Sequence, residues 1–334
     1  MIPIACLSVS WACLHISISA KTSIMKTKLS VAINIVLALI LSAVLLGQFG
    51  FSSKESVPPK APAAQAIPDN LPVFRSPDLP PNLDFCGEAV PLDRWDVRER
   101  LDREILFNSY YASNILYTLK LAHRYFPVIS ERLKANGVPD DFKYLAIAES
   151  NLVVTAISRS GATSFWQFLD KTAPEYGLTV NKEIDLRYDI EQSTDAACKY
   201  FKQAYAKFGS WTAAAASYNC GQTGYSNRAE FQRIQHYYDL HLPEETNRYI
   251  FRILAFKYLL ENAGSLGYQL EDSEKYPVIP YKTVTVNSTI PDLAEFAIRQ
   301  GTSYKILKLM NPWIKEKSLT VSGNRQYTLK LPLK

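Results

Sequence analysis

Apolar residues recur at three- and four-residue steps through most of the chain between residues 92 and 264. This spacing places apolar side chains on one face of a helix. We therefore predict six helices, within residues 91–108, 113–137, 139–150, 193–209, 211–219 and 243–264. Strand-like alternation is almost absent from this region, so the pattern predicts a mainly α domain over residues 92–268.

Residues that begin and end helices support these boundaries. Gly137 follows the second predicted helix and favours its termination, because glycine readily adopts the left-handed conformation. Pro139 suits the first turn of the next helix. Ser193 or Thr194 is the predicted start of the fourth helix, and Gly209 is its predicted end.

The pattern changes after residue 276. The segments "YKTVTVN" and "QYTLKLPL" alternate like strands, and "PDLAEFAIRQG" and "SYKILKLMN" between them have the spacing of two short helices. We predict a small βααβ module over residues 276–334, separate from the helical domain.

The N-terminal part of the chain has a different character. Residues 31–52 form an uncharged, apolar stretch that is long enough to span a bilayer. Lysines precede it, so we expect residues 1–30 in the cytoplasm and the rest of the chain outside it. We favour an uncleaved anchor over a cleaved signal peptide; Met25 begins a more typical export signal, so part of the first segment is a candidate start-site extension. Repeated proline makes residues 53–91 a predicted semi-rigid spacer.

Composition narrows the classes of partner. The net charge of +5 fits an anionic cell-wall polymer or a membrane surface, but it is too small to indicate nucleic acid. The five cysteines include no CxxC pair, so we expect neither a disulfide framework nor a zinc site. These cysteines are Cys6, Cys13, Cys86, Cys198 and Cys220. We expect no metal and no cofactor.

The predicted helix over residues 139–150 ends an apolar face on a carboxylate. Phe142, Leu145, Ala146 and Glu149 follow the i, i+3, i+4, i+7 spacing, so they share one face. Burial of that face carries Glu149 to the edge of the core, where loss of hydration raises the pKa of a carboxyl group. A carboxyl that stays protonated near neutral pH can protonate a glycosidic oxygen. A solvent-exposed glutamate at a fraying helix end is the alternative from this helix alone.

Later segments contain parts that suit a saccharide groove. "SRSGATSFWQF" combines a Gly-Ala turn with Trp166 and Gln167, and "AASYNCGQTG" places Tyr218 and Asn219 before a glycine-rich loop. Aromatic rings offer stacking surfaces, and amides both donate and accept hydrogen bonds. Taken singly, Trp166 and Tyr218 are more typical of a core, and each glycine-rich loop of a simple turn.

Together these motifs resemble the catalytic domain of lytic murein transglycosylases, in particular the membrane-bound D type, whose fold is lysozyme-like. The resemblance covers roughly residues 95–265. It rests on "ES" at 149–150, "GATSFWQF" at 161–168, "YGL" at 176–178, "IDLRYD" at 184–189, "STDAACKYF" at 193–201, "AASYNCG" at 215–221 and "EETNRY" at 244–249. The C-terminal module resembles a LysM domain in "LKLMNPW" at 307–313, although "NSTI" stands where "GDTL" is usual.

The resemblance implies cleavage of the β-1,4 bond between N-acetylmuramic acid and N-acetylglucosamine in peptidoglycan, with formation of 1,6-anhydromuramic ends. It implies that Glu149 is the single general acid and base. The residues implied to line the subsite are Ser150, Gln167, Tyr218, Asn219 and Tyr249, and we expect Trp166 beside them as an aromatic wall. The expected location is the periplasmic or cell-wall side of a membrane.

Two residues depart from the family pattern. Ser164 stands where the family usually has glycine, and Cys220 stands where it usually has alanine. A serine would crowd the turn if this position requires a positive φ. Neither departure affects Glu149, the residue implied to be the general acid.

Two other functions remain open at this point. A lysozyme-type muramidase would hydrolyse the same bond, and a non-catalytic scaffold would only bind peptidoglycan. A second carboxylate is typical of glycosidases, and Asp170, Glu175, Asp185 and Asp189 are the candidates. The motif "IDLRYD" fits better with a structural pairing to Arg187.

Overall fold

The computed structural model describes residues 75–323 and 325–333 of the chain. The predicted cytoplasmic segment, the predicted membrane segment over residues 31–52 and the first part of the predicted spacer lie outside the described residues. Within the described ranges, no helix is long and apolar enough to cross a membrane.

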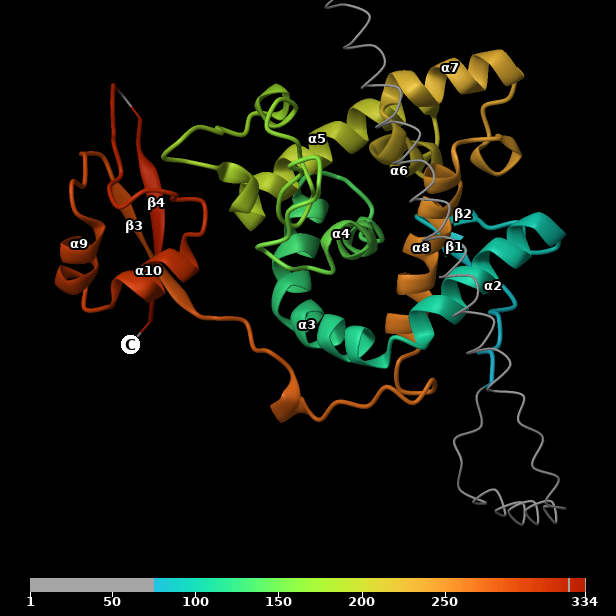
Figure 1. Cartoon of the computed structure of the whole chain (residues 1–334), viewed down its shortest axis with the longest axis horizontal. Helices are drawn as coiled ribbons and strands as arrows, with labels where there is room; N and C mark the ends of the chain where they lie inside the picture. Colours follow the sequence, from blue (N-terminus) through green and yellow to red (C-terminus); the bar gives the residue numbers. More distant parts are fainter. Residues whose placement is uncertain (1–74, 324, 334) are drawn as a thin grey trace, which may run out of the picture. The chain divides into compact units, whose positions relative to one another are not determined.

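The described part of the chain is mainly helical, as predicted (Figure 1). All six predicted helices are present, and α7 is an addition. The helices are α2 (Trp95–Ser109), α3 (Ala112–Ala135), α4 (Phe142–Ser150), α5 (Ile190–Phe208), α6 (Trp211–Cys220), α7 (Gln222–Gln232), α8 (Glu244–Glu261), α9 (Leu293–Arg299) and α10 (Tyr304–Met310). The strands are β1 (Asp84–Phe85), β2 (Glu88–Ala89), β3 (Tyr281–Val286) and β4 (Tyr327–Pro332), and they form two antiparallel pairs.

Helix α4 is a short helix in the middle of the helical part, between α3 and α8 (Figure 1). Leu145, Ala146 and Ile147 have no exposed surface. At its start, the ring of Phe142 packs on Phe201 of α5 with ring centroids 4.1 Å apart. Because α4 is enclosed on several sides by close-packed side chains, the core fixes the direction in which its last turn points.

The predicted spacer over residues 53–91 extends too far into the chain. Phe85 in the β1–β2 hairpin is fully buried and packs edge-on against Phe142. The Glu88 carboxylate accepts four hydrogen bonds from residues 210–212 at the start of α6. A carboxylate is favourable at a helix N-terminus, because the unpaired amides there carry partial positive charge. The hairpin is therefore part of the helical unit.

Helix α5 begins earlier than predicted. Its N-cap is Asp189, whose carboxylate accepts hydrogen bonds from two amides of the first turn. Ser193 and Thr194 are buried inside the helix, so neither caps it. Aspartate satisfies the free amides of a helix start as well as serine does. Gly209 ends the helix with φ of 69°, as predicted.

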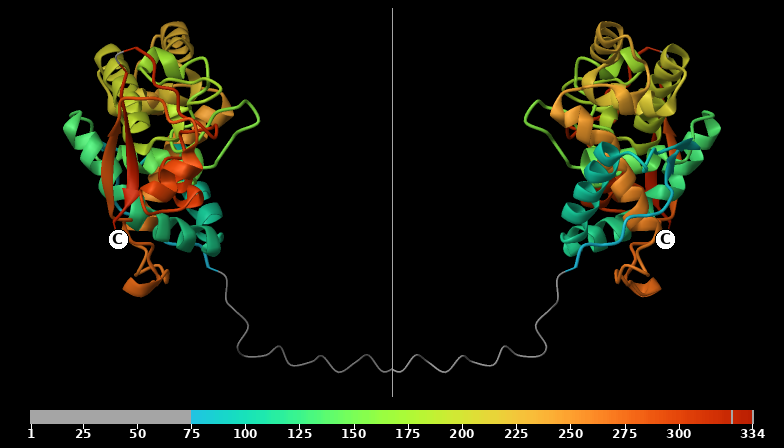
Figure 2. Two further views of the ribbon diagram at one scale, coloured as in Figure 1. Left: turned by 90° about the vertical axis from the view of Figure 1, so that its left-hand side faces the viewer. Right: turned by 90° about the vertical axis from the view of Figure 1, so that its right-hand side faces the viewer.

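The C-terminal residues form the predicted βααβ module. Strands β3 and β4 pair antiparallel, with Val284 opposite Leu329, and they run side by side in Figure 2. Asn311 after α10 is fully buried. Its side chain donates to the carbonyl oxygens of Leu307 and Lys330 and accepts from the Lys330 amide. This asparagine thereby ties the end of α10 to β4.

Candidate active site

Glu149 lies in the last turn of α4. Its side chain is half-buried, and the Tyr249 hydroxyl from α8 donates a hydrogen bond to its Oε1 atom. The helix ends directly afterwards, because Asn151 and Leu152 have left-handed backbone conformations with φ of 50° and 60°. The carboxyl group therefore stands at the end of a buried helix and faces a partner from a second helix.

Burial raises the pKa of Glu149 to about 7. Loss of hydration is the largest cause, because it disfavours the charged carboxylate. The hydrogen bond from Tyr249 and the positive charge of Arg252 lower the pKa, whereas the negative charge of Glu245 raises it. The outcome is a carboxyl group that holds a proton close to neutral pH.

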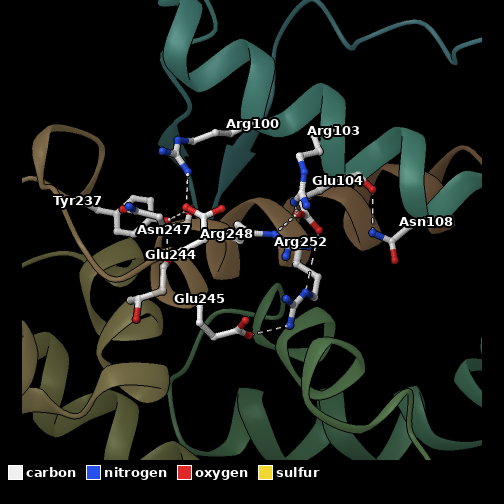
Figure 3. A network of polar contacts seen from close by, with 11 residues as sticks. Arg100, Arg103, Glu104, Asn108, Tyr237, Glu244, Glu245, Asn247, Arg248 and Arg252 are labelled. Atoms are coloured by element: carbon white, nitrogen blue, oxygen red, sulfur yellow. Dashed lines mark hydrogen bonds and ion pairs between the residues drawn. The ribbon is translucent and has the colours of Figure 1, made fainter. Parts of the chain in front are cut away.

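A charged network between α2 and α8 includes Arg252 (Figure 3). Glu104 on α2 is only 2% exposed, and Arg248 donates a hydrogen bond of 2.7 Å to it. Arg252 lies 4.0 Å from the other oxygen of Glu104 and 3.1 Å from an oxygen of Glu245. Because two carboxylates share Arg252, they offset its charge, and burial remains the dominant influence on the pKa of Glu149.

The active-site loop, defined as residues 156–168, follows α4 and closes on itself. Gly161, Ser164 and Gln167 have φ of 81°, 64° and 49°. The Ser164 amide donates to the Ala156 carbonyl oxygen at 2.8 Å. The Gln167 side-chain amide donates to the Ser164 carbonyl oxygen at 2.7 Å. Gln167 thus uses its amide nitrogen inside the loop, while its side chain stays partly exposed.

Trp166 does not fit the expected role of an aromatic wall. Its side chain has no exposed surface, and its indole N–H donates a hydrogen bond of 2.9 Å to the Thr194 hydroxyl. A fully buried ring cannot stack on a sugar. Its carbonyl oxygen instead accepts a hydrogen bond of 2.6 Å from the Tyr218 hydroxyl. Trp166 therefore positions Tyr218.

Ser150 is also turned inward. It is 8% exposed, and its hydroxyl lies 3.0 Å from the Ala146 carbonyl oxygen and 3.1 Å from that of Phe165. These bonds tie the end of α4 to the active-site loop. A structural role therefore fits Ser150 better than the expected contact with substrate.

Tyr218 and Asn219 lie near the end of α6. Burial, and next the charge of Glu149, hold the pKa of the Tyr218 hydroxyl well above its usual range. The Thr246 hydroxyl, one helical turn before Tyr249 on α8, donates a hydrogen bond of 2.8 Å to Asn219 Oδ1. The amide nitrogen of Asn219 has no hydrogen-bond partner in the part of the chain that the structure describes. It is available as a donor to a ligand.

The four candidates for a second catalytic carboxylate either have structural roles or lie exposed at the surface. Asp185 forms a bidentate ion pair with Arg187, at 2.9 and 2.7 Å, which confirms the structural pairing. Asp189 caps α5. Asp170 and Glu175 are exposed. Among these four, none contributes to the electrostatic environment of the candidate acid.

Glu104, Glu245 and Arg252 form a charged network beside the candidate acid that the sequence analysis did not predict. One signal was available for Arg252: it follows Tyr249 by three residues on a predicted helix, so both lie on one face. Glu245 lies inside the motif "EETNRY". Glu104 lies on α2, more than one hundred residues before Glu245 and Arg252, and no local pattern connects it with them.

We found no group of three or more histidine, cysteine or acidic side chains in residues 75–323 and 325–333 that could hold a metal ion. The described cysteines, Cys86, Cys198 and Cys220, are free thiols. Burial raises the pKa of each of them, so they are weak nucleophiles at neutral pH.

Glu149 is expected to make the folded state less stable as the pH rises. Its pKa in the folded state is about 7, against an ordinary value of 4.5, so between these values only the folded state retains the proton. The stabilisation is complete below the ordinary pKa and is lost as the pH rises through about 7, by roughly 2–3 kcal/mol. Urea denaturation at pH 5 and pH 8 measures the change. The Glu149→Gln variant lacks this titration, and an equal change in both proteins would contradict the raised pKa.

Ser164→Gly is expected to raise the free energy of unfolding by about 1 kcal/mol. The left-handed backbone costs serine roughly 1 kcal/mol or more, and the buried Ser164 hydroxyl has no hydrogen-bond partner among the described residues. Glycine removes both penalties but loses more backbone entropy. Thermal and urea denaturation measure the gain. Ser164→Ala is the matched control, because it removes only the hydroxyl; a glycine variant less stable than the alanine variant would refute the backbone argument.

Two family models match the chain. Residues 126–237 match the transglycosylase SLT domain, and residues 282–334 match the soluble lytic transglycosylase C-terminal LysM-like domain. The chain is 28% identical over 250 residues to the membrane-bound lytic murein transglycosylase D of Escherichia coli strain K12. The protein of the same name from Escherichia coli O6:H1 strain CFT073 has the same identity. The matches cover 72% of this chain and 53% of each relative, so the chain spans about half the length of these relatives.

Proposed function

We propose that this chain, which carries a transglycosylase SLT domain and a LysM-like domain, is a lytic transglycosylase that cleaves the β-1,4 bond between N-acetylmuramic acid and N-acetylglucosamine. The observation that carries the proposal is Glu149, a carboxyl group at the end of a buried helix with a pKa raised to about 7. It lies within the segment that matches the SLT domain. The name of the two relatives, lytic murein transglycosylase, supports the same reaction class.

In the first step, protonated Glu149 donates its proton to the glycosidic oxygen while the bond from that oxygen to the anomeric carbon breaks. Positive charge develops at the anomeric carbon of the muramic residue. The carbonyl oxygen of the substrate's own N-acetyl group stabilises this charge, so the enzyme needs no second carboxylate as a nucleophile. Asp185 pairs with Arg187 and Asp189 caps α5, and these structural roles agree with a mechanism that uses a single acid.

In the second step, the Glu149 carboxylate takes the proton of the muramic C6 hydroxyl, and the C6 oxygen bonds to the anomeric carbon. A 1,6-anhydro ring closes, water takes no part, and Glu149 regains its proton for the next cycle. The hydroxyl of Tyr249 donates to Glu149 and stabilises the carboxylate that exists between the two steps. A pKa near 7 lets one group serve first as acid and then as base.

We propose Gln167, Tyr218 and Asn219 as the residues that contact the sugar beside Glu149. The free amide nitrogen of Asn219 supports this role, as does the partial exposure of all three side chains. Ser150 supports these residues without contacting the sugar, because its hydroxyl donates to carbonyl oxygens of the protein.

The proposed partner is the glycan strand of peptidoglycan, and the proposed location is the cell-wall side of a membrane. The apolar segment over residues 31–52 and the lysines before it support export. An uncleaved anchor and a cleaved signal peptide would both place the catalytic domain there. The word "membrane-bound" in the name of the relatives supports the anchor.

Digestion of purified sacculi tests the reaction. The full chain is incubated with sacculi in H₂¹⁸O, and mass spectrometry identifies the soluble products. We expect 1,6-anhydro muropeptides without ¹⁸O. Reducing ends that carry ¹⁸O would identify a muramidase, and the absence of soluble products together with retained sacculus binding would identify a scaffold.

A further inference from the structure

Backbone hydrogen bonds join the LysM-like domain to the catalytic domain. The Asp185 amide donates to the Trp313 carbonyl oxygen at 2.8 Å, and the Lys315 amide donates to the Glu183 carbonyl oxygen at 2.7 Å. These two bonds flank a β-bridge between two buried isoleucines. Backbone pairing of this kind fixes register and direction, unlike a contact between side chains alone.

Side chains extend the contact on both sides of the bridge. The Glu183 carboxylate accepts hydrogen bonds from the Thr320 amide at 3.0 Å and the Thr320 hydroxyl at 3.2 Å. In the sheet of the LysM-like domain, Lys330 donates to Glu191 at 2.8 Å, and the Tyr281 hydroxyl donates to the same oxygen at 3.0 Å. Glu191 lies in the first turn of α5. The LysM-like domain therefore contacts two separate parts of the catalytic domain, residues 183–185 and the start of α5.

Arg187 connects the first of these contacts with the active-site loop. Its guanidinium pairs with Asp185 and also donates to the carbonyl oxygens of Gly161, at 3.2 Å, and Phe168, at 3.0 Å. Gly161 and Phe168 lie at the turn and at the end of the loop. Asp185 is the residue whose amide binds Trp313, so one short segment binds the LysM-like domain through its backbone and the loop through its side chains.

The loop has a conformation that needs such support. Ser164 and Gln167 both have positive φ, which is unfavourable for residues with a side chain. Strained backbone persists only when its surroundings hold it in place. The second contact acts on the same loop, because α5 carries Thr194, whose hydroxyl binds the indole of Trp166.

We infer that the LysM-like domain braces the active-site loop: docking on residues 183–187 fixes Asp185 and Arg187, and Arg187 fixes the loop that carries Gln167. Glu183, Asp185 and Arg187 are positioning residues in this arrangement. The brace acts whether or not the LysM-like domain binds glycan. Its effect on catalysis rests on the proposed function, whereas its effect on the loop does not.

The test uses the full chain with the double substitution Glu183→Ala and Lys330→Ala, which removes side-chain contacts on both sides of the bridge. Amide hydrogen exchange should become about tenfold faster in residues 156–168. Glu316→Ala is the matched control, because Glu316 lies at the same contact and its carboxylate, within residues 75–323 and 325–333, forms an ion pair only with exposed Lys182, at 3.8 Å. We expect no change in the loop for this control. Glu183→Gln, used in place of Glu183→Ala in the double variant, retains an acceptor oxygen. It should restore most of the protection of residues 156–168 against hydrogen exchange.

The kinetic readout is the release of anhydro products from soluble glycan fragments too short to reach both domains. For the double variant we expect kcat to fall about tenfold and KM to change less than about twofold, since the loop positions groups around the reacting bond. Faster exchange near residues 313–320 with unchanged exchange in the loop would overturn the brace. Equal loss of kcat in the control would also overturn it. A chain that releases no product at all but shows the exchange difference refutes the proposed reaction and leaves the brace standing.

Discussion

Glu149→Gln is expected to lower the rate of glycan release from sacculi by about 10³-fold. Glutamine keeps the volume of the side chain, and its Oε1 atom can still accept the hydrogen bond from Tyr249. The amide has no acidic proton to give to the glycosidic oxygen, and it cannot take a proton from the C6 hydroxyl afterwards. Both proposed steps therefore fail, while the shape of the site is retained.

The measurement compares initial rates of anhydro-muropeptide release and, separately, binding to sacculi. Binding should stay within about twofold of the unchanged protein, because the loss lies in the transition state and not in the ground state. Glu245→Gln is the matched control. It removes a neighbouring carboxylate that raises the pKa of Glu149, so it should keep activity and shift the pH profile to lower pH. A Glu149→Gln variant with a near-normal rate would remove this residue from the mechanism.

The hydrophobic pattern predicted the helical domain and the βααβ module well, because each helix buries one periodic face. It placed the start of α5 one turn late, since Ser193 and Asp189 are both good caps and only packing decides between them. It did not predict α7, whose sequence "QTGYSNRAEFQ" is mostly polar and contains a glycine. The β1–β2 hairpin was missed because prolines precede it and a single residue, Phe85, provides its burial.

The candidate site was predictable in part. Helical spacing placed Glu149 at the edge of the core, and burial does raise its pKa. Its partner Tyr249 lies one hundred residues further along the chain, and only the family resemblance connected the two. The sequence could not distinguish an aromatic wall from a core residue, and Trp166 belongs to the core. Orientation of a side chain depends on tertiary packing, which a local pattern does not contain.

The sequence predicts that Ser164 crowds its turn if the position requires a positive φ, and the structure supports this prediction. The position has a positive φ, and the serine hydroxyl there is buried without a partner among the described residues. A loop that tolerates this strain must gain stability elsewhere. The hydrogen bonds from Arg187 to its carbonyl oxygens are one source of that stability.

Arg187→Met is expected to lower the free energy of unfolding by about 3–5 kcal/mol. Asp185 is 4% exposed, and its main partner is the bidentate guanidinium of Arg187. Methionine fills much of the same space but leaves a buried carboxylate without its counter-charge. Two carbonyl oxygens of the active-site loop also lose their donor. The cost is therefore that of an isolated buried charge together with unpaired acceptors.

A double-mutant cycle separates these contributions. Asp185→Asn combined with Arg187→Met removes both charges, so it should be more stable than Arg187→Met alone by about 1–3 kcal/mol. Arg299→Met is the control for loss of an arginine, because its pair with Glu295 is exposed on both sides and should be worth less than about 0.5 kcal/mol. Urea denaturation gives all of these free energies. If Arg187→Met costs no more than Arg299→Met, then Asp185 does not depend on Arg187, and the ion pair is not what holds the active-site loop in its strained conformation.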